Sequence, residues 1–154
     1  MDRIRKFLRL PSGEQWQVCK ATLLLLSVRF LLRVLPFPTV RPFLAKACRR
    51  SRALPQFSAR KLAWSVATAS RFVPGGGHCL SQAITLQIFL TRRSYDSRVC
   101  FGVQRHLGAP FMAHAWVEHD GEVLIGGENL GRFVRLTPRS HSATGSGVLA
   151  VPFA

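Results

Sequence analysis

Residues 79–121 read CLSQAITLQIFLTRR (79–93), SYDSRVCFGVQRHLGAP (94–110) and FMAHAWVEHDG (111–121), and this stretch decides the fold. Its first part is a long apolar run that ends in two arginines, and cations suit the last turn of a helix. From residue 97 the period changes to two, because apolar side chains alternate over 97–103 and a second strand is expected over 111–119. The Asp-Gly pair at its end is a hairpin signal. The stretch therefore predicts a buried helix followed by antiparallel strands.

The chain before residue 74 is helical in pattern. Residues 14–35 are rich in leucine and contain no glycine or proline, which predicts a long helix largely surrounded by core. A second helix is expected around residues 42–50, where several basic side chains cluster. Ser58 marks the entry of a third helix, which has an apolar face and should run to about Arg71.

Two further strands are expected after the hairpin, over residues 122–125 and 133–136. Helices first and an antiparallel sheet afterwards define an α+β class. The length of 154 residues fits a single domain, 1–154. Within it we distinguish three parts: a basic helical part (1–73), a helix-plus-sheet part (74–138) and a Ser/Gly-rich tail expected to be mobile (139–154).

The charge is strongly positive and unevenly distributed. Twenty-two basic residues stand against seven acidic ones, a formal net charge of +15, and no acid occurs between Glu14 and Asp96. Such a field attracts nucleic acid, an anionic membrane or an acidic peptide, and charge alone does not choose among them. No nucleic-acid motif is visible, so we expect no specific nucleic acid partner. A basic nucleic-acid or membrane-surface module remains an alternative function.

The cysteines and the apolar segments indicate which cofactors and which cellular compartment to expect. Four scattered cysteines without a CxxC pair predict neither a disulfide framework nor a zinc site, and we expect no metal and no cofactor. The longest uncharged part of the apolar amino-terminal run, residues 21–28, is far shorter than the ~20 residues of a membrane span. No secretory signal is evident. The expectation is a cytoplasmic protein with no membrane span.

Cys79 and His114 are the candidate reactive pair. Cys79 follows three glycines and opens the apolar helix, where unpaired N–H groups and the helix dipole favour a thiolate. His114 lies in the middle of the second expected strand, in an apolar setting. A helix-borne Cys followed by a strand-borne His is the order of papain-like and transglutaminase-like cysteine enzymes. A buried thiol and a satisfied core histidine are the alternative interpretation.

Several short motifs follow one another in a fixed order: Cys79-Leu80, Leu86-Gln87, Arg92-Arg93, Gly102-Val103, AHAWVE (113–118) and Asp120-Gly121. As a set, they resemble the lasso-peptide biosynthesis B protein in its stand-alone leader peptidase form, a transglutaminase-like cysteine protease. The resemblance implies a transglutaminase-like or papain-like fold. It also implies a hydrolase that removes the leader from a ribosomally made lasso-peptide (RiPP) precursor.

The same resemblance implies partners and roles. The partners are the precursor peptide, a separate leader-recognition protein and the lasso macrocyclase that acts on the product. Carried over by position, Cys79 attacks the scissile carbonyl and His114 carries its proton to the leaving amine. The backbone N–H of Cys79 is one oxyanion donor, and the second donor is not identified.

The third member of a triad is where the chain departs from the resembled family. That family usually has an acid about twelve residues after the histidine, and here this position is Gly126. A tight hairpin brings residues 126–127 opposite His114, so the nearest side chains are Glu128 and Asn129. We favour Glu128. Three alternatives remain open: Asn129 as the third member, a Cys-His dyad whose imidazole is held by backbone or water, and an inactive transglutaminase-like scaffold.

Overall fold

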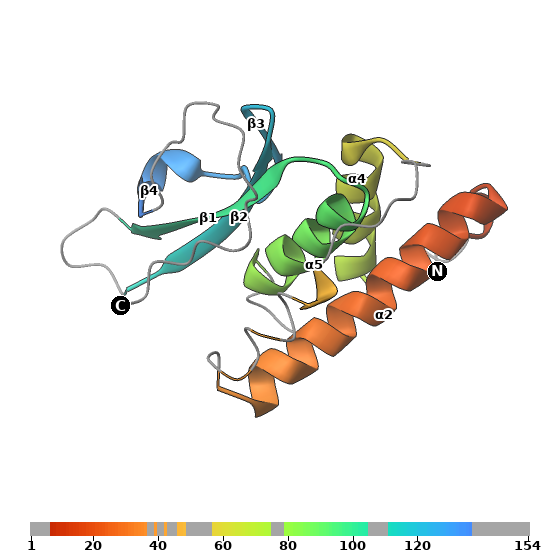
Figure 1. Ribbon diagram of the computed structural model, residues 1–154, viewed down its shortest axis with the longest axis horizontal. Helices are drawn as coiled ribbons and strands as arrows, with labels where there is room; N and C mark the ends of the chain where they lie inside the picture. The colour runs from red at the N-terminus through yellow and green to blue at the C-terminus, as the bar shows by residue number, and fades with distance from the viewer. Residues whose placement is uncertain are drawn as a thin grey trace.

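The computed structural model describes residues 7–36, 39, 42, 46–48, 57–74, 79–104 and 111–136 (Figure 1). Its described elements are α2 (Ser12–Val34), α4 (Ala59–Ser70), α5 (Cys79–Arg92), β1 (Ser97–Gln104), β2 (Ala113–His119), β3 (Glu122–Ile125), the 3₁₀ turn η1 (Leu130–Arg132) and β4 (Phe133–Arg135). Helices come first and an antiparallel sheet follows, so the predicted α+β class is confirmed.

The two helices expected before residue 74 that fall on described residues are present with local signals at their ends. Ser58 precedes α4, and its Oγ accepts a hydrogen bond from the backbone N–H of Lys61 at 3.3 Å, as an N-cap does. α2 ends where Leu35 turns extended. Most of the expected helix at 42–50 and the whole tail 139–154 lie outside the described residues.

The four strands form one antiparallel sheet in the order β3-β2-β1-β4. β1 pairs with β2 so that Gly102 lies opposite His114. The turn from β2 to β3 has positive φ at both Asp120 (49°) and Gly121 (78°), which a two-residue hairpin of the expected kind requires. β4, although last in the chain, returns to the free edge of β1.

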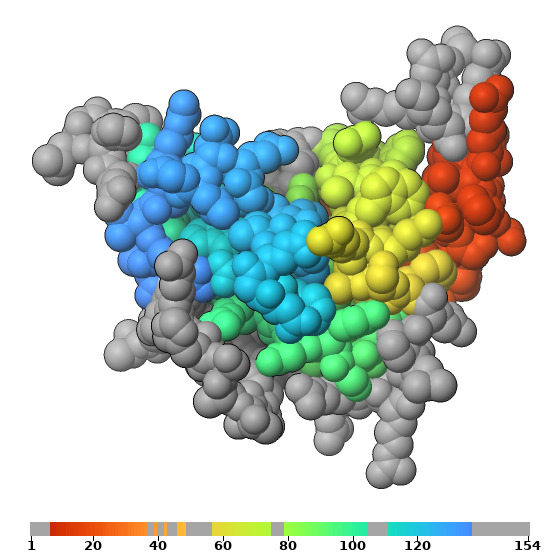
Figure 2. Space-filling model, turned by 90° about the horizontal axis from the view of Figure 1, so that it is seen from above, coloured from red at the N-terminus to blue at the C-terminus, as the bar shows by residue number. Residues whose placement is uncertain are grey.

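The helices cover one face of this sheet. α5 packs against β1 and β2, while α4 contacts α2, α5 and β3. Figure 2 shows α4, in yellow, between α2, in red, and the blue strands. The main core joins these elements through buried side chains such as Leu62, Leu86, Ala115 and Val117. In the described part of the chain, no helix is long and apolar enough to cross a membrane.

Candidate active site

Cys79 is the first residue of α5, as expected, and its side chain is partly buried. The first backbone N–H groups of a helix have no partner within the helix and lie at the positive end of its dipole. An oxyanion that forms at this position can therefore accept hydrogen bonds from the backbone itself. The three glycines before His78 and Cys79 lie outside the described residues.

The topology brings Cys79 and His114 to the same end of the helix–sheet pair. Only four residues separate the end of α5 from the start of β1, so the chain reverses there. The start of α5 then lies at the end of β1, where Gly102 pairs with His114. In Figure 1 α5 and β2 run in the same direction and begin on the same side of the molecule.

Gln87 joins α5 to the first strand of the sheet through hydrogen bonds. It is buried in α5, and its Nε2 donates to the carbonyl oxygen of Ser97 at 2.9 Å. The hydroxyl of Ser97 donates back to Gln87 Oε1 at 3.2 Å. These reciprocal bonds attach α5 to the first residue of β1.

His114 lies on the face of the sheet that α5 does not cover. Ala115 and Val117 belong to the core against α5, and successive side chains of a strand point to opposite faces. The imidazole stacks on Phe133, with ring centroids 4.9 Å apart, and on Trp116, at 6.2 Å. The expectation of a mid-strand histidine is wrong, because His114 is the second residue of β2. Its ring therefore lies near the end of the strand.

The imidazole of His114 has one ring nitrogen committed to the backbone. Nε2 lies 2.8 Å from the carbonyl oxygen of Gly126. A carbonyl only accepts hydrogen bonds, so Nε2 carries the proton in the neutral ring and donates it. The other nitrogen, Nδ1, then holds a lone pair that can accept a proton. In this tautomer Nδ1 is the nitrogen available to act as a general base.

Gly126 cannot carry the acid that the resembled family has at this position. Its φ is +77°, and an added Cβ would lie 2.8 Å from the carbonyl oxygen of Ala115 and 3.0 Å from Cβ of Trp116. A side chain at this position is disfavoured for two reasons. Its Cβ would clash with neighbouring backbone, and the positive φ is strained for any residue other than glycine. Gly126 acts through its carbonyl instead.

Glu128 and Asn129 follow in an exposed turn. Glu128 is solvent-exposed, and Asn129 has a left-handed conformation with φ of 58° before η1 begins. The bond described for the imidazole of His114 goes to Gly126 rather than to either of them. The structure thus brings His114 and Gly126 together, with Glu128 turned towards solvent.

A partly buried ion pair supports the aromatic side chains that pack against His114. Arg135 donates from Nη1 to Glu118 Oε1 at 2.6 Å and from Nη2 to Oε2 at 2.8 Å, a two-point pairing. Trp116 Nε1 donates to Glu118 Oε1 at 2.9 Å, and Arg135 also reaches Cys100 Sγ at 2.9 Å. Burial works to raise the pKa of Glu118, but the bonds from Arg135 and Trp116 outweigh it and hold the pKa at about 2.

Sequence reasoning missed Arg135. His114, Trp116 and Glu118 recur at every second position, which indicates one shared face. The partner of Glu118 comes from β4, which returns beside β1 across the sheet, and local periodicity carries no signal for that return. Cys100 is fully buried, and its Sγ lies 2.9 Å from Arg135 Nη2.

The comparison with protein families agrees with this arrangement. The Transglutaminase-like superfamily matches residues 22–137, which include α5 and all four strands. The chain therefore belongs to the Transglutaminase-like superfamily, which includes cysteine proteases. No curated protein and no solved structure matches the chain.

Proposed function

We propose that the chain is a cysteine peptidase that removes the leader from a lasso-peptide precursor. The observation that carries the proposal is the hydrogen bond from His114 Nε2 to the Gly126 carbonyl, since it leaves Nδ1 as a base. Cys79 at the first position of α5 supplies a nucleophile at the same end of the sheet. Family membership supports the class, and the motif resemblance supports the leader substrate.

The proposed reaction needs only these groups and water. His114 Nδ1 takes the thiol proton as Cys79 Sγ bonds to the scissile carbonyl carbon, and the backbone N–H of Cys79 donates to the oxyanion. The C–N bond then breaks, and the imidazolium gives its proton to the leaving amine. Water attacks the resulting thioester while His114 again takes a proton. The carboxyl product leaves, and the proton returns to the thiolate.

The orientation of the imidazole is the distinctive part of this proposal. Gly126 O holds the Nε2–H, so the ring is oriented without a charged third member. His114 lies on the face of the sheet that α5 does not cover, so the proposed reaction requires its Nδ1 to reach Cys79 Sγ around the end of β2. Glu128 is the side chain that the sequence favours as third member, and its exposure makes the carbonyl the stronger candidate.

The proposal includes partners and a compartment. The substrate is the precursor peptide, presented by a separate leader-recognition protein, and the product passes to the macrocyclase. These steps would take place in the cytoplasm. An inactive transglutaminase-like scaffold is the second candidate function, because no carboxylate is bonded to His114 among the described residues.

Leader release measured by mass spectrometry tests the proposal. The purified chain is incubated with the precursor and the leader-recognition protein, alongside the Cys79→Ala and His114→Ala variants. Cys19→Ala is the matched control, because Cys19 is an exposed cysteine on α2. We expect release by the parent chain and by Cys19→Ala, and none by the other two. No release by the parent chain would favour the inactive scaffold.

A further inference from the structure

The outer face of α2 exposes a row of large apolar side chains. Trp16, Leu23 and Phe30 are 63%, 69% and 66% exposed, and Leu26 and Val34 are also exposed. The inner face of the same helix is buried against α4 and α5. Scattered apolar residues on a surface are ordinary, but a contiguous row is typical of an interaction site. We call the exposed row Trp16, Leu23, Leu26, Phe30 and Val34 the outer stripe.

The spacing of the outer stripe is that of a helix–helix seam. Trp16, Leu23 and Phe30 are seven residues apart, and Leu26 lies three residues after Leu23. Apolar side chains at the first and fourth positions of a seven-residue repeat keep one face of a helix towards a partner helix. α2 has 23 residues, long enough for three such repeats. The pattern therefore matches a second helix lying along α2.

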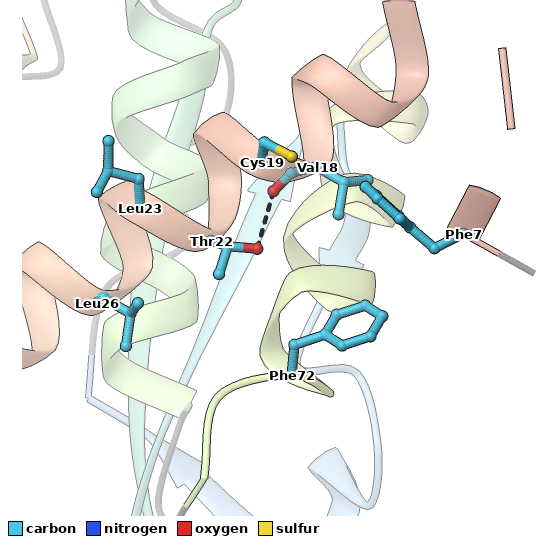
Figure 3. Close-up of a pocket in the computed structure, with 7 residues that line it drawn as sticks. All are labelled: Phe7, Val18, Cys19, Thr22, Leu23, Leu26 and Phe72. Atoms are coloured by element: carbon cyan, nitrogen blue, oxygen red, sulfur yellow. Dashed lines mark hydrogen bonds between the residues drawn. The ribbon is translucent and has the colours of Figure 1, made fainter. Parts of the chain in front are cut away.

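A hollow beside the stripe has the shape that such a partner needs. Leu23, Leu26 and Cys19 line one side of a groove of about 370 Å³, and Phe7 and Phe72 line the other (Figure 3). The one hydroxyl in its wall, on Thr22, is turned to the carbonyl of Val18 at 2.9 Å, so the lining is apolar (Figure 3). A side chain from a neighbouring helix can insert there as a knob into a hole. A flat bilayer surface has no such protrusion.

The charges around the stripe favour an acidic partner. Lys20 and Arg33 are exposed, and the helical repeat places them on the two opposite flanks of the stripe. The Nζ of Lys20 lies 5.1 Å from the ring centre of Trp16. Glu14 is the single acid of α2, and it is paired with Lys61. A second copy of this chain would bring its own net charge of +15 against the first. Like charges at such a seam are unfavourable, whereas acidic flanks are attracted.

We propose that the outer stripe of α2 binds an amphipathic helix with acidic flanks from a partner protein. Apolar side chains of the partner helix pack against Leu23 and Leu26, and its carboxylates pair with Lys20 and Arg33. The stripe lies on the side of α2 that faces away from α5, so the partner does not cover the end of α5 where Cys79 lies. This surface is independent of the proposed peptidase activity, and its test requires no substrate.

A synthetic helix of about three heptads tests the proposal by fluorescence anisotropy. The probe peptide carries Leu at the first and fourth heptad positions and Glu on both flanks. One control peptide has Lys in place of Glu, and another has the probe's composition in scrambled order. We expect the full chain to bind the probe at least about tenfold more tightly than either control. The scrambled peptide separates recognition from simple attraction to a basic protein, so equal binding of both would overturn the proposal.

Protein variants locate the binding. Leu23→Glu with Phe30→Glu changes two exposed side chains of the stripe, and circular dichroism checks that the helices are retained. Phe111→Glu is the matched control, because Phe111 is 82% exposed and lies outside the helices. We expect the double variant to weaken probe binding about tenfold or more, and Phe111→Glu to change it less than about twofold. An unchanged affinity in the double variant overturns the proposal.

Two further measurements test the other occupants. Sedimentation velocity of the parent chain should show a monomer. A dimer that the double variant dissociates would assign the stripe to a second copy and overturn the acidic partner. Flotation with phosphatidylglycerol–phosphatidylcholine vesicles should be the same for the parent chain and the double variant. Flotation lost only in the double variant would assign the stripe to an anionic bilayer, with the same consequence.

Discussion

His114 donates a hydrogen bond from Nε2 to the carbonyl oxygen of Gly126 at 2.8 Å, and the two residues are twelve positions apart. A backbone carbonyl fixes the tautomer and orientation of an imidazole as a carboxylate does, but it carries no full charge. It therefore stabilises the imidazolium less in the transition state. In the proposed peptidase, the Gly126 carbonyl would therefore position the imidazole as a third triad member does, without supplying its negative charge.

Gly126→Ala should disturb both stability and catalysis. The added Cβ has to fit a φ of +77° and lies 2.8 Å from Ala115 O. We expect a loss of about 1–3 kcal/mol in the free energy of unfolding, measured by urea denaturation, and slower leader release because the carbonyl shifts. Gly127→Ala is the control, since a Cβ there meets only the side chain of Val123, at 3.3 Å. Equal effects of the two variants would contradict a special role for Gly126.

Glu128→Gln separates a dyad from a triad. Glu128 is exposed, and the imidazole of His114 is bonded to Gly126, so we expect leader release within about twofold of the parent chain. The rate is measured with saturating precursor. Because amide and carboxylate have nearly the same shape, folding should not change. A loss of about a hundredfold or more would assign Glu128 as the third member and reject the carbonyl as sufficient.

Glu118→Gln should lower the free energy of unfolding at neutral pH. It should also make that free energy less dependent on pH between 4.5 and 2. The pKa of Glu118 is about 2 in the folded chain, below its ordinary 4.5, so its contribution is complete above pH 4.5 and is lost as the pH falls towards 2. We expect the variant to lose about 1–3 kcal/mol of unfolding free energy at pH 7. The difference from the parent chain should shrink towards pH 2.

Glu122→Gln is the control for that series. Glu122 pairs with Arg60 at 2.9 Å, but both side chains are largely exposed. An exposed ion pair contributes about 0–1 kcal/mol, so this variant should differ little from the parent chain at any pH. Equal losses in Glu122→Gln and Glu118→Gln at pH 7 would mean that the partly buried pair of Glu118 with Arg135 contributes no more to stability than an exposed pair. Urea denaturation at several pH values measures both.

The sequence predicts the elements well because each has a local signal. Periodicity and the Ser58 cap predict α4, and the Asp120–Gly121 turn predicts the β2–β3 hairpin. The face of the sheet that α5 covers could not be predicted in this way. Alternation indicates that His114 and Trp116 share a face, but it does not indicate which face the helices cover.

The sequence could predict the side chains of the candidate site but not the backbone group that bonds to His114. Cys79 is marked by its position at the start of an apolar helix, and His114 by its polar side chain in an apolar strand. A backbone acceptor has no sequence signature, since every residue has a carbonyl, so the bond to Gly126 could not be predicted. The only related feature of the sequence is that Gly126 stands where the resembled family has an acid. The positive φ and the close approach of Ala115 O explain that glycine.

Gln87→Leu tests whether the attachment of α5 to β1 sets the position of Cys79. Leucine keeps the helix and the buried volume, but it leaves the carbonyl of Ser97 without the bond from Gln87 Nε2. We expect a loss of about 1–3 kcal/mol in unfolding free energy and, if α5 shifts along the sheet, a lower rate of leader release at saturating precursor. Gln82→Leu, on the same helix but partly exposed, is the control and should change neither value appreciably. Lower stability with an unchanged rate of leader release would mean that Gln87 supports the fold without positioning the thiol of Cys79. Core packing alone would then be enough to keep α5 in place relative to the sheet.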